Sequence, residues 1–140
     1  MNTLFQLHPR LQEDCIGLGR LDLCQVLMMN DSQFPWFVLV PEIADVQEIY
    51  QLDKVQRGLL SEESCYLAEQ LATLYQADKM NIAAIGNLVP QLHVHHIVRY
   101  RNDIAWPAPV WGKFAAVPYS PAQLAARVAQ LNAWLSLKPV

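Results

Sequence analysis

The segment at residues 91–99 constrains this chain most, because it places three of the four histidines in one apolar, β-branched run, Gln-Leu-His-Val-His-His-Ile-Val-Arg. Such a run is typical of a β-strand, in which alternate side chains lie on the same face. His93 and His95 then share one face, whereas His96 lies on the other. Each imidazole has two nitrogen atoms that need partners once they leave water, so the pair is costly to bury unless it is satisfied or used.

The length of the chain and the absence of repeats or linkers predict a single domain over residues 1–140, and the strand and helix patterns described below make it α+β. A chain of this length with 53% hydrophobic residues can bury a core without disulfides or a structural metal. Its three cysteines are widely spaced and form no Cys-x-x-Cys pair, which fits a soluble protein in a reducing cytoplasm. With 10 Lys and Arg residues and a formal charge of −3, binding to duplex nucleic acid or to an anionic membrane is not expected. No uncharged apolar run approaches the length of a membrane span.

Four strands are predicted, in two pairs. Residues 21–29 alternate loosely and residues 36–40 are apolar, and the Asn-Asp-Ser turn between them predicts a hairpin. Residues 81–85 regain strand character before a Gly-Asn turn at residues 86–87. This turn predicts that residues 81–85 lie antiparallel to the histidine strand.

Capping residues mark two predicted helices. Asp53 and Gln56 have the spacing of a capping box, and they begin one long helix whose apolar positions recur as far as Leu74. Ser120 and Gln123 have the same spacing and begin a C-terminal helix.

Three further segments give weaker signals. The polar residues 1–20 carry no clear period and no element is assigned to them. A short helix is expected over residues 45–50. Residues 101–119 are rich in Pro and Trp without a period, which predicts an ordered loop over a pocket.

The residue types alone leave three interpretations of the histidines open. A structural, hydrogen-bonded role is the better one for His96, which faces away from the pair. A metal site would need a third ligand beside His93 and His95, and neither His8 nor a carboxylate has a recognisable ligand spacing, so we expect no metal. In the third interpretation, one neutral imidazole attacks a phosphate and the other handles the leaving group.

The order of motifs resembles the histidine triad family, whose signature is His-x-His-x-His followed by two apolar residues. Gln91, His93 and His95 stand at the three signature positions. Within the family, the chain looks like short bacterial proteins with Trp-Pro and Pro-Val-Trp-Gly segments, found here at residues 106–107 and 109–112. The resemblance implies an antiparallel sheet with a long helix packed on one face and a C-terminal helix. It also implies a homodimer, a nucleotide or dinucleotide substrate and no cofactor.

The resemblance also implies roles for individual residues. His93 would be the nucleophile that forms a covalent nucleotidyl-histidine, and His95 would contact the phosphate or the leaving group. The backbone carbonyl of Gln91 would hold the ring proton of His93. Asn87 would donate its amide to the phosphate, a role that is as plausible as that of a left-handed turn residue. Asn30 would contact a ribose.

Three further side chains carry interpretations of their own. Arg99 lies on the face of the histidine pair, where it would neutralise phosphate charge, although a solvated arginine at a strand end is more common. Trp106 and Trp111 would stack on a nucleobase or fill the core beneath the loop, and packing is expected for at least one of them.

Two departures from the family pattern affect the expected activity. The first triad histidine is replaced by Gln91, and Trp36 lies near the position where many members carry an additional histidine. Loss of general acid or base help typically costs about 10² to 10⁴ in rate. We therefore expect a nucleotide phosphohydrolase or nucleotidyl transferase that is slow or suited to good leaving groups. The alternative is a nucleotide-binding or regulatory module with little turnover.

Overall fold

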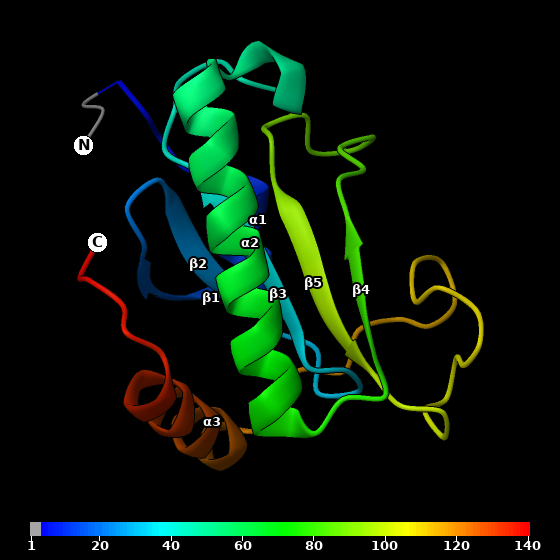
Figure 1. Ribbon diagram of the computed structural model, residues 1–140. Coiled ribbons are helices and arrows are strands. Elements are labelled where there is room, and N and C mark those ends of the chain that lie inside the picture. Colours follow the sequence, from blue (N-terminus) through cyan, green and yellow to red (C-terminus); the bar gives the residue numbers. More distant parts are fainter. Residues whose placement is uncertain (1–3) are drawn as a thin grey trace.

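The computed structural model describes residues 4–140 and contains a five-stranded sheet in which all neighbouring strands are antiparallel. Helix α2 runs along one face of the sheet, and helix α3 lies near the C-terminal end of α2 (Figure 1). The predicted α+β class, with a long helix on one face and a C-terminal helix, is confirmed. In sheet order the strands are β1 (Cys15–Arg20), β2 (Cys24–Met29), β3 (Trp36–Pro41), β5 (Val94–Arg99) and β4 (Lys79–Ala83).

The helices begin where their capping residues predicted. Helix α2 (Lys54–Tyr75) has Asp53 as its N-cap, with the complete capping box to Gln56, and Gly58 does not interrupt it. Helix α3 (Pro121–Trp134) begins after the equivalent box of Ser120. The short helix expected over residues 45–50 is wrong. Asp45 has a φ of 60°, which a right-handed helix excludes, and a 3₁₀ turn, η1 (Ile49–Gln51), forms instead.

The N-terminal region contains two elements that the sequence analysis did not assign, helix α1 (Pro9–Asp14) and edge strand β1. Two glycines obscure the alternation of β1, and its register with β2 shifts between Gly17 and Gly19. A Cβ atom on Gly19 would lie 2.7 Å from the carbonyl oxygen of Lys138, in a backbone with φ of 148°. Glycine is therefore needed where the C-terminal segment crosses this strand.

The two strand pairs form as predicted, with shifted boundaries. Strands β2 and β3 make the expected hairpin, and β4 pairs antiparallel with β5. Strand β4 begins two residues earlier than expected, at Lys79, because its pairing with β5 extends back to Arg99. Strand β5 begins at Val94, so His93 lies immediately before the strand.

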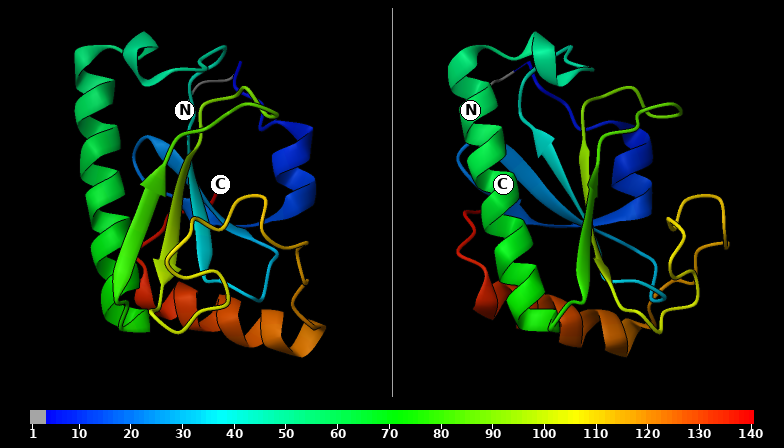
Figure 2. Two further views of the ribbon diagram at one scale, coloured as in Figure 1. Left: turned by 90° about the vertical axis from the view of Figure 1, so that its right-hand side faces the viewer. Right: turned by 45° about the vertical axis from the view of Figure 1, so that its right-hand side comes forward.

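The two faces of the sheet are covered differently. Helix α2 covers one face, whereas α1 and the loop at residues 101–119 lie on the opposite side (Figure 2). The core under α2 includes Leu67 and Leu71 of the helix with Val94 and Val98 of β5. Within residues 4–140, none of the helices combines the length and apolarity needed to cross a membrane.

Candidate functional site

A cavity of about 450 Å³ lies on the sheet face away from α2, beside the start of β5. His93 and His95 both line it, so the predicted histidine pair meets at one cavity. Trp36 of β3 and Trp111 of the loop form its aromatic wall. The remaining lining residues are Met29, Ile85, Gly86, Asn87, Leu88, Val89 and Gly112.

The hydrogen bond of His93 fixes which of its nitrogens carries a proton. Nδ1 lies 2.7 Å from the backbone carbonyl oxygen of Gln91, the contact expected from the family resemblance. A carbonyl oxygen only accepts, so Nδ1 must carry the hydrogen. In the neutral ring, Nε2 of His93 then has a free lone pair, which is what a nucleophile requires.

His95 has the opposite arrangement of donor and acceptor at Nδ1. The indole Nε1 of Trp36 donates to Nδ1 of His95 over 2.9 Å. Because an indole nitrogen can only donate, Nδ1 must accept, and the proton of the neutral imidazole stays on Nε2. Burial, reinforced by the neighbouring charges of His93 and His96, lowers the pKa of His95 to about 3. His95 is therefore a neutral ring whose Nε2–H is a hydrogen-bond donor.

The sequence analysis missed this contact, although the strand register contains it. Trp36 pairs with Ile97 and Val38 pairs with His95 across β3 and β5. Trp36 and His95 are thus diagonal neighbours on one face, within reach of an aromatic side chain. This contact could have been predicted only from the pairing of β3 with β5, two strands that are far apart in the sequence.

Aromatic rings pack around His95. The ring centroids of His93 and His95 are 4.9 Å apart with an interplanar angle of 70°. Trp111 meets His95 edge-on at 5.3 Å, and its buried Nε1 has no hydrogen-bond partner among residues 4–140. Trp106 instead packs over the guanidinium of Arg99 at 5.6 Å. The expectation that at least one of the two loop tryptophans serves packing thus applies to Trp106.

His96 lies on the other face of β5 and is fully buried. Its Nδ1 donates to the carbonyl oxygen of Val94 over 3.0 Å, so its Nε2 accepts from the hydroxyl of Ser64 in α2 over 2.7 Å. Burial lowers the pKa of His96 to about 4. Both ring nitrogens are satisfied inside the protein, which agrees with the structural interpretation of His96.

The side chain of Gln91 does not line the histidine cavity. Its Oε1 accepts from the backbone nitrogen of His8 over 2.9 Å, and its Nε2 donates to the carbonyl oxygen of Gln6 over 2.9 Å. Gln91 therefore serves the site through its carbonyl group, while its side chain tethers the N-terminal segment.

Arg99 lies on the predicted face but does not line the cavity, so its predicted contact with phosphate needs correction. The side chain is 1% exposed, and Nε and Nη2 donate to the carboxylate of Asp103 over 2.8 and 3.1 Å. Nη1 donates to Asn81, and Nη2 also donates to the carbonyl of Ala108. This pairing lowers the pKa of the Asp103 carboxyl group. The guanidinium anchors the loop instead of facing a ligand.

The two predicted asparagines have different locations. Asn87 is exposed and lines the cavity with the histidines. The left-handed backbone conformation of this turn belongs to Gly86, with φ of 70°, and not to Asn87. Asn30 does not line the cavity, and its Oδ1 accepts from the backbone nitrogen of Tyr119 over 3.0 Å. The structure therefore brings Asn87, but not Asn30, to the histidine pair.

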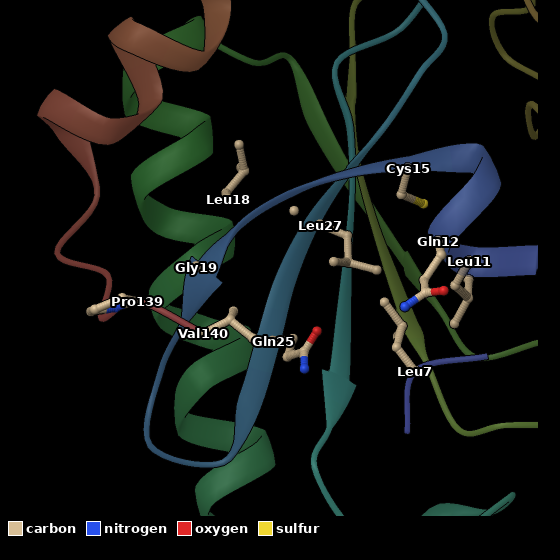
Figure 3. A pocket seen from close by; sticks show the side chains of 11 residues that line it. Leu7, Leu11, Gln12, Cys15, Leu18, Gly19, Gln25, Leu27, Pro139 and Val140 are labelled. Carbon is tan, nitrogen blue, oxygen red and sulfur yellow. The ribbon is translucent and has the colours of Figure 1, made fainter. Parts of the chain in front are cut away.

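Outside this cavity, the part of the chain that the structure describes has a second hollow but no group of three metal-ligating side chains. Among residues 4–140, no three His, Cys, Asp or Glu side chains gather into a possible metal site. Another hollow, of about 380 Å³, lies between α1, β1, β2 and the C-terminal segment (Figure 3). Its walls are mainly aliphatic, and burial raises the pKa of its one thiol, Cys15, to about 12. This hollow lacks a nucleophile that is active near neutral pH.

Comparisons with known proteins extend the similarity beyond the histidine segment. The HIT domain model matches residues 10–102. A histidine triad protein from Marinobacter aquaeolei is 52% identical with a TM-score of 0.92, over 94% of this chain and 96% of that one. Histidine triad proteins from Bradyrhizobium japonicum and Sinorhizobium meliloti are 42% and 41% identical, with TM-scores of 0.90 and 0.91. Those alignments cover 94% and 95% of this chain and 98% of each relative. A search of curated proteins found no match.

Proposed function

This chain belongs to the histidine triad family, and from that premise we propose that it is a nucleotide hydrolase or nucleotidyl transferase. The proposed reaction proceeds through a covalent nucleotidyl-histidine on His93. One observation carries the proposal, namely that the hydrogen bonds at Nδ1 leave a lone pair on Nε2 of His93 and a proton on Nε2 of the adjacent His95. A nucleophile and a hydrogen-bond donor thus stand side by side in a cavity.

In the first step, the lone pair on Nε2 of His93 attacks the phosphorus of a nucleotide phosphoanhydride or phosphoramidate. A nitrogen–phosphorus bond forms, and the bond to the leaving group breaks with its electron pair on the leaving group. A phosphate leaves as the anion, whereas the amine of a phosphoramidate must also take up a proton from solvent. The carbonyl of Gln91 holds the Nδ1 proton as the ring becomes cationic. Nε2–H of His95 donates to the phosphoryl group, which stabilises the charge that develops there.

In the second step, water or another acceptor attacks the same phosphorus. The nitrogen–phosphorus bond breaks, its electron pair returns to Nε2 of His93, and the proton of the acceptor passes to solvent. Apolar and aromatic walls such as Met29, Leu88 and Trp111 suit a nucleoside, and the amide of Asn87 at the rim is a candidate donor to the phosphate.

The test is a search for the covalent intermediate. Purified protein is mixed with labelled nucleoside phosphoramidates and dinucleoside polyphosphates, quenched rapidly and measured by intact mass. We expect a nucleotidyl adduct that is absent in His93→Ala and present in His96→Gln, the matched control on the other face of β5. An adduct that persists in His93→Ala would overturn the assignment of the nucleophile.

A nucleotide-binding module is the second candidate function. It is favoured by Gln91 and Trp36, because neither side chain can take up and release a proton as histidine does at the corresponding family positions. Saturable nucleotide binding with neither adduct nor turnover would select this candidate over the enzyme.

A further inference from the structure

The contact between Trp36 and His95 limits the chemistry open to His95. Nδ1 of His95 lies 2.9 Å from the indole Nε1, a group that donates and cannot accept. A proton on Nδ1 would point at the indole hydrogen and break this bond. Trp36 and His95 are both buried, so water does not readily replace the lost partner.

The surroundings of His95 supply no charge that would favour protonation. Its ring centroid is 5.7 Å from that of Trp36, 4.9 Å from that of His93 and 5.3 Å from that of Trp111. The groups that influence its pKa are burial, His93 and His96, all of which lower it, and no carboxylate is among them. An imidazolium at position 95 is therefore disfavoured by the tertiary contacts.

A neutral His95 with its proton on Nε2 can donate a hydrogen bond but is a poor proton donor. Transfer of that proton would leave an imidazolate facing the N–H of Trp36. Resting on the function proposed above, we infer that Trp36 is a specificity-determining residue that restricts this site to leaving groups that depart without taking a proton. The favoured substrates are nucleotidyl anhydrides of carboxylic and phosphoric acids. Phosphoramidates and alkyl esters, whose nitrogen or oxygen must be protonated to leave, are disfavoured.

The favoured step balances without a general acid. The lone pair of His93 forms the bond to phosphorus, and the bond from phosphorus to the leaving oxygen breaks. The leaving oxygen keeps the electron pair and departs as a carboxylate or phosphate anion. The proton of His95 stays on Nε2 throughout, and water later releases the nucleotide and returns the electron pair to His93.

The leaving-group dependence of the rate tests this inference. The probes are nucleoside 5′-phosphates esterified with phenols of graded acidity, from p-nitrophenol to phenol, and kcat/KM is measured for each. The wild-type rate should fall steeply as the phenol becomes less acidic. A shallow dependence in the wild type would overturn the inference.

Three variants separate proton transfer from positioning. Trp36→His places a ring nitrogen at the same number of bonds from Cα as the indole Nε1, and this nitrogen can either donate to Nδ1 of His95 or accept a hydrogen bond from it. Nδ1 can then hold a proton when Nε2 gives its own proton to the leaving group. We expect it to raise the rate with the phenyl ester about 10²-fold relative to the p-nitrophenyl ester, the size of a general acid contribution. Trp36→Phe should slow all esters by a similar factor and keep the steep dependence. Trp111→Phe removes an indole N–H that has no partner within residues 4–140, and the steep dependence should remain.

The tautomer of His95 is a readout that does not depend on turnover. Long-range proton–nitrogen NMR spectra distinguish a ring with its hydrogen on Nε2 from one with its hydrogen on Nδ1. We expect the Nε2–H form of His95 in the wild type from pH 8 down to pH 5, and a mixture in Trp36→Phe. A cationic His95 in the wild type above pH 5 would overturn the inference.

The outcomes distinguish this inference from the proposed function. If no ester forms an adduct on His93, the proposed function fails, whatever the tautomer of His95. If adducts form on His93 but wild type and Trp36→His share one leaving-group dependence, the function stands and the inference fails.

Discussion

The two faces of strand β5 carry the same type of side chain in opposite circumstances. On the face toward α2, both ring nitrogens of His96 have protein partners, the carbonyl of Val94 and the hydroxyl of Ser64. On the cavity face, His93 and His95 each bond through Nδ1, and within the described chain no hydrogen bond engages either Nε2. The comparison indicates that the number of satisfied ring nitrogens, and not the residue type or burial, distinguishes a histidine with only structural contacts from one that keeps a nitrogen available for a ligand.

The cavity face itself divides into the end with His93 and His95, called the reactive end for its proposed role, and the anchoring end with Arg99. At the reactive end, only Nδ1 of His95 is hydrogen-bonded to a described residue. At the anchoring end, the guanidinium of Arg99 donates hydrogen bonds to Asp103, Asn81 and the carbonyl of Ala108. That anchor holds the start of the loop whose later residue Trp111 meets His95. The anchoring end therefore supports the aromatic wall of the reactive end.

The largest expected effect is the loss of turnover when the proposed nucleophile on the cavity face is removed. His93→Ala should lower turnover by about 10³-fold or more, because it removes the attacking lone pair, while the far-ultraviolet circular dichroism stays that of the folded protein. His96→Gln should show the reverse, with turnover retained and stability lowered. Equal losses of turnover in the two variants would show that the faces do not differ in function.

The next largest effect is the loss of stability when the ion pair at the anchoring end is broken. Asp103→Asn leaves the charge of Arg99 buried without its partner, and we expect the free energy of unfolding to fall by about 3–5 kcal/mol. Chemical denaturation measures the change. In the matched double variant, Arg99→Met with Asp103→Leu, most of the stability should return because no buried charge remains. A loss below 1 kcal/mol in Asp103→Asn, on the order of an exposed ion pair, would contradict the anchoring role.

Acid should lower the stability of the protein through a histidine on each face of β5, because these histidines bind protons more readily in the unfolded chain than in the folded protein. The pKa of His95 lies at about 3 and that of His96 at about 4, against an ordinary value of 6.5. As the pH falls from 6.5 toward 4, the unfolded chain binds protons that the folded protein does not, so stability decreases. Each histidine contributes about 1.4 kcal/mol per pH unit within this window.

Denaturation midpoints measured between pH 6 and 4.5 check this dependence. His96→Gln should reduce the slope of the free energy of unfolding against pH by about 1.4 kcal/mol per unit, because one of the two histidines no longer titrates. An unchanged slope would mean that His96 is already protonated in the folded protein.

The smallest effect concerns the side chain that replaces the first triad histidine. Gln91→Ala removes two hydrogen bonds to the N-terminal segment, which should cost about 1–2 kcal/mol of stability. The carbonyl that orients His93 belongs to the backbone and remains, so the rate of adduct formation should change little. Rapid-quench mass spectrometry and denaturation measure the two quantities. A large loss of adduct with little loss of stability would give the Gln91 side chain a role in the reaction.

Local sequence chemistry was sufficient for much of the fold. The capping boxes at Asp53 and Ser120 predicted the starts of α2 and α3, and the alternation over residues 91–99 predicted which histidines share a face. These features depend on residues a few positions apart, whose geometry the backbone itself imposes. Strand β1 was missed because Gly17 and Gly19 remove the side chains from which an alternation is recognised.

What the sequence by itself determined is the histidine strand and its two faces, whereas the carbonyl contact at His93 was expected from the family resemblance. What only the tertiary structure decided is the partner of each remaining polar atom. Trp36 fixes the tautomer of His95, Gln91 tethers residues near the N-terminus, and Asp103 forms a salt bridge with Arg99. Two of these three depend on segments that are far apart in the sequence, and all depend on burial. A hydrogen-bonding group in the interior takes whichever partner the packing brings near, and the residue type alone does not specify that partner.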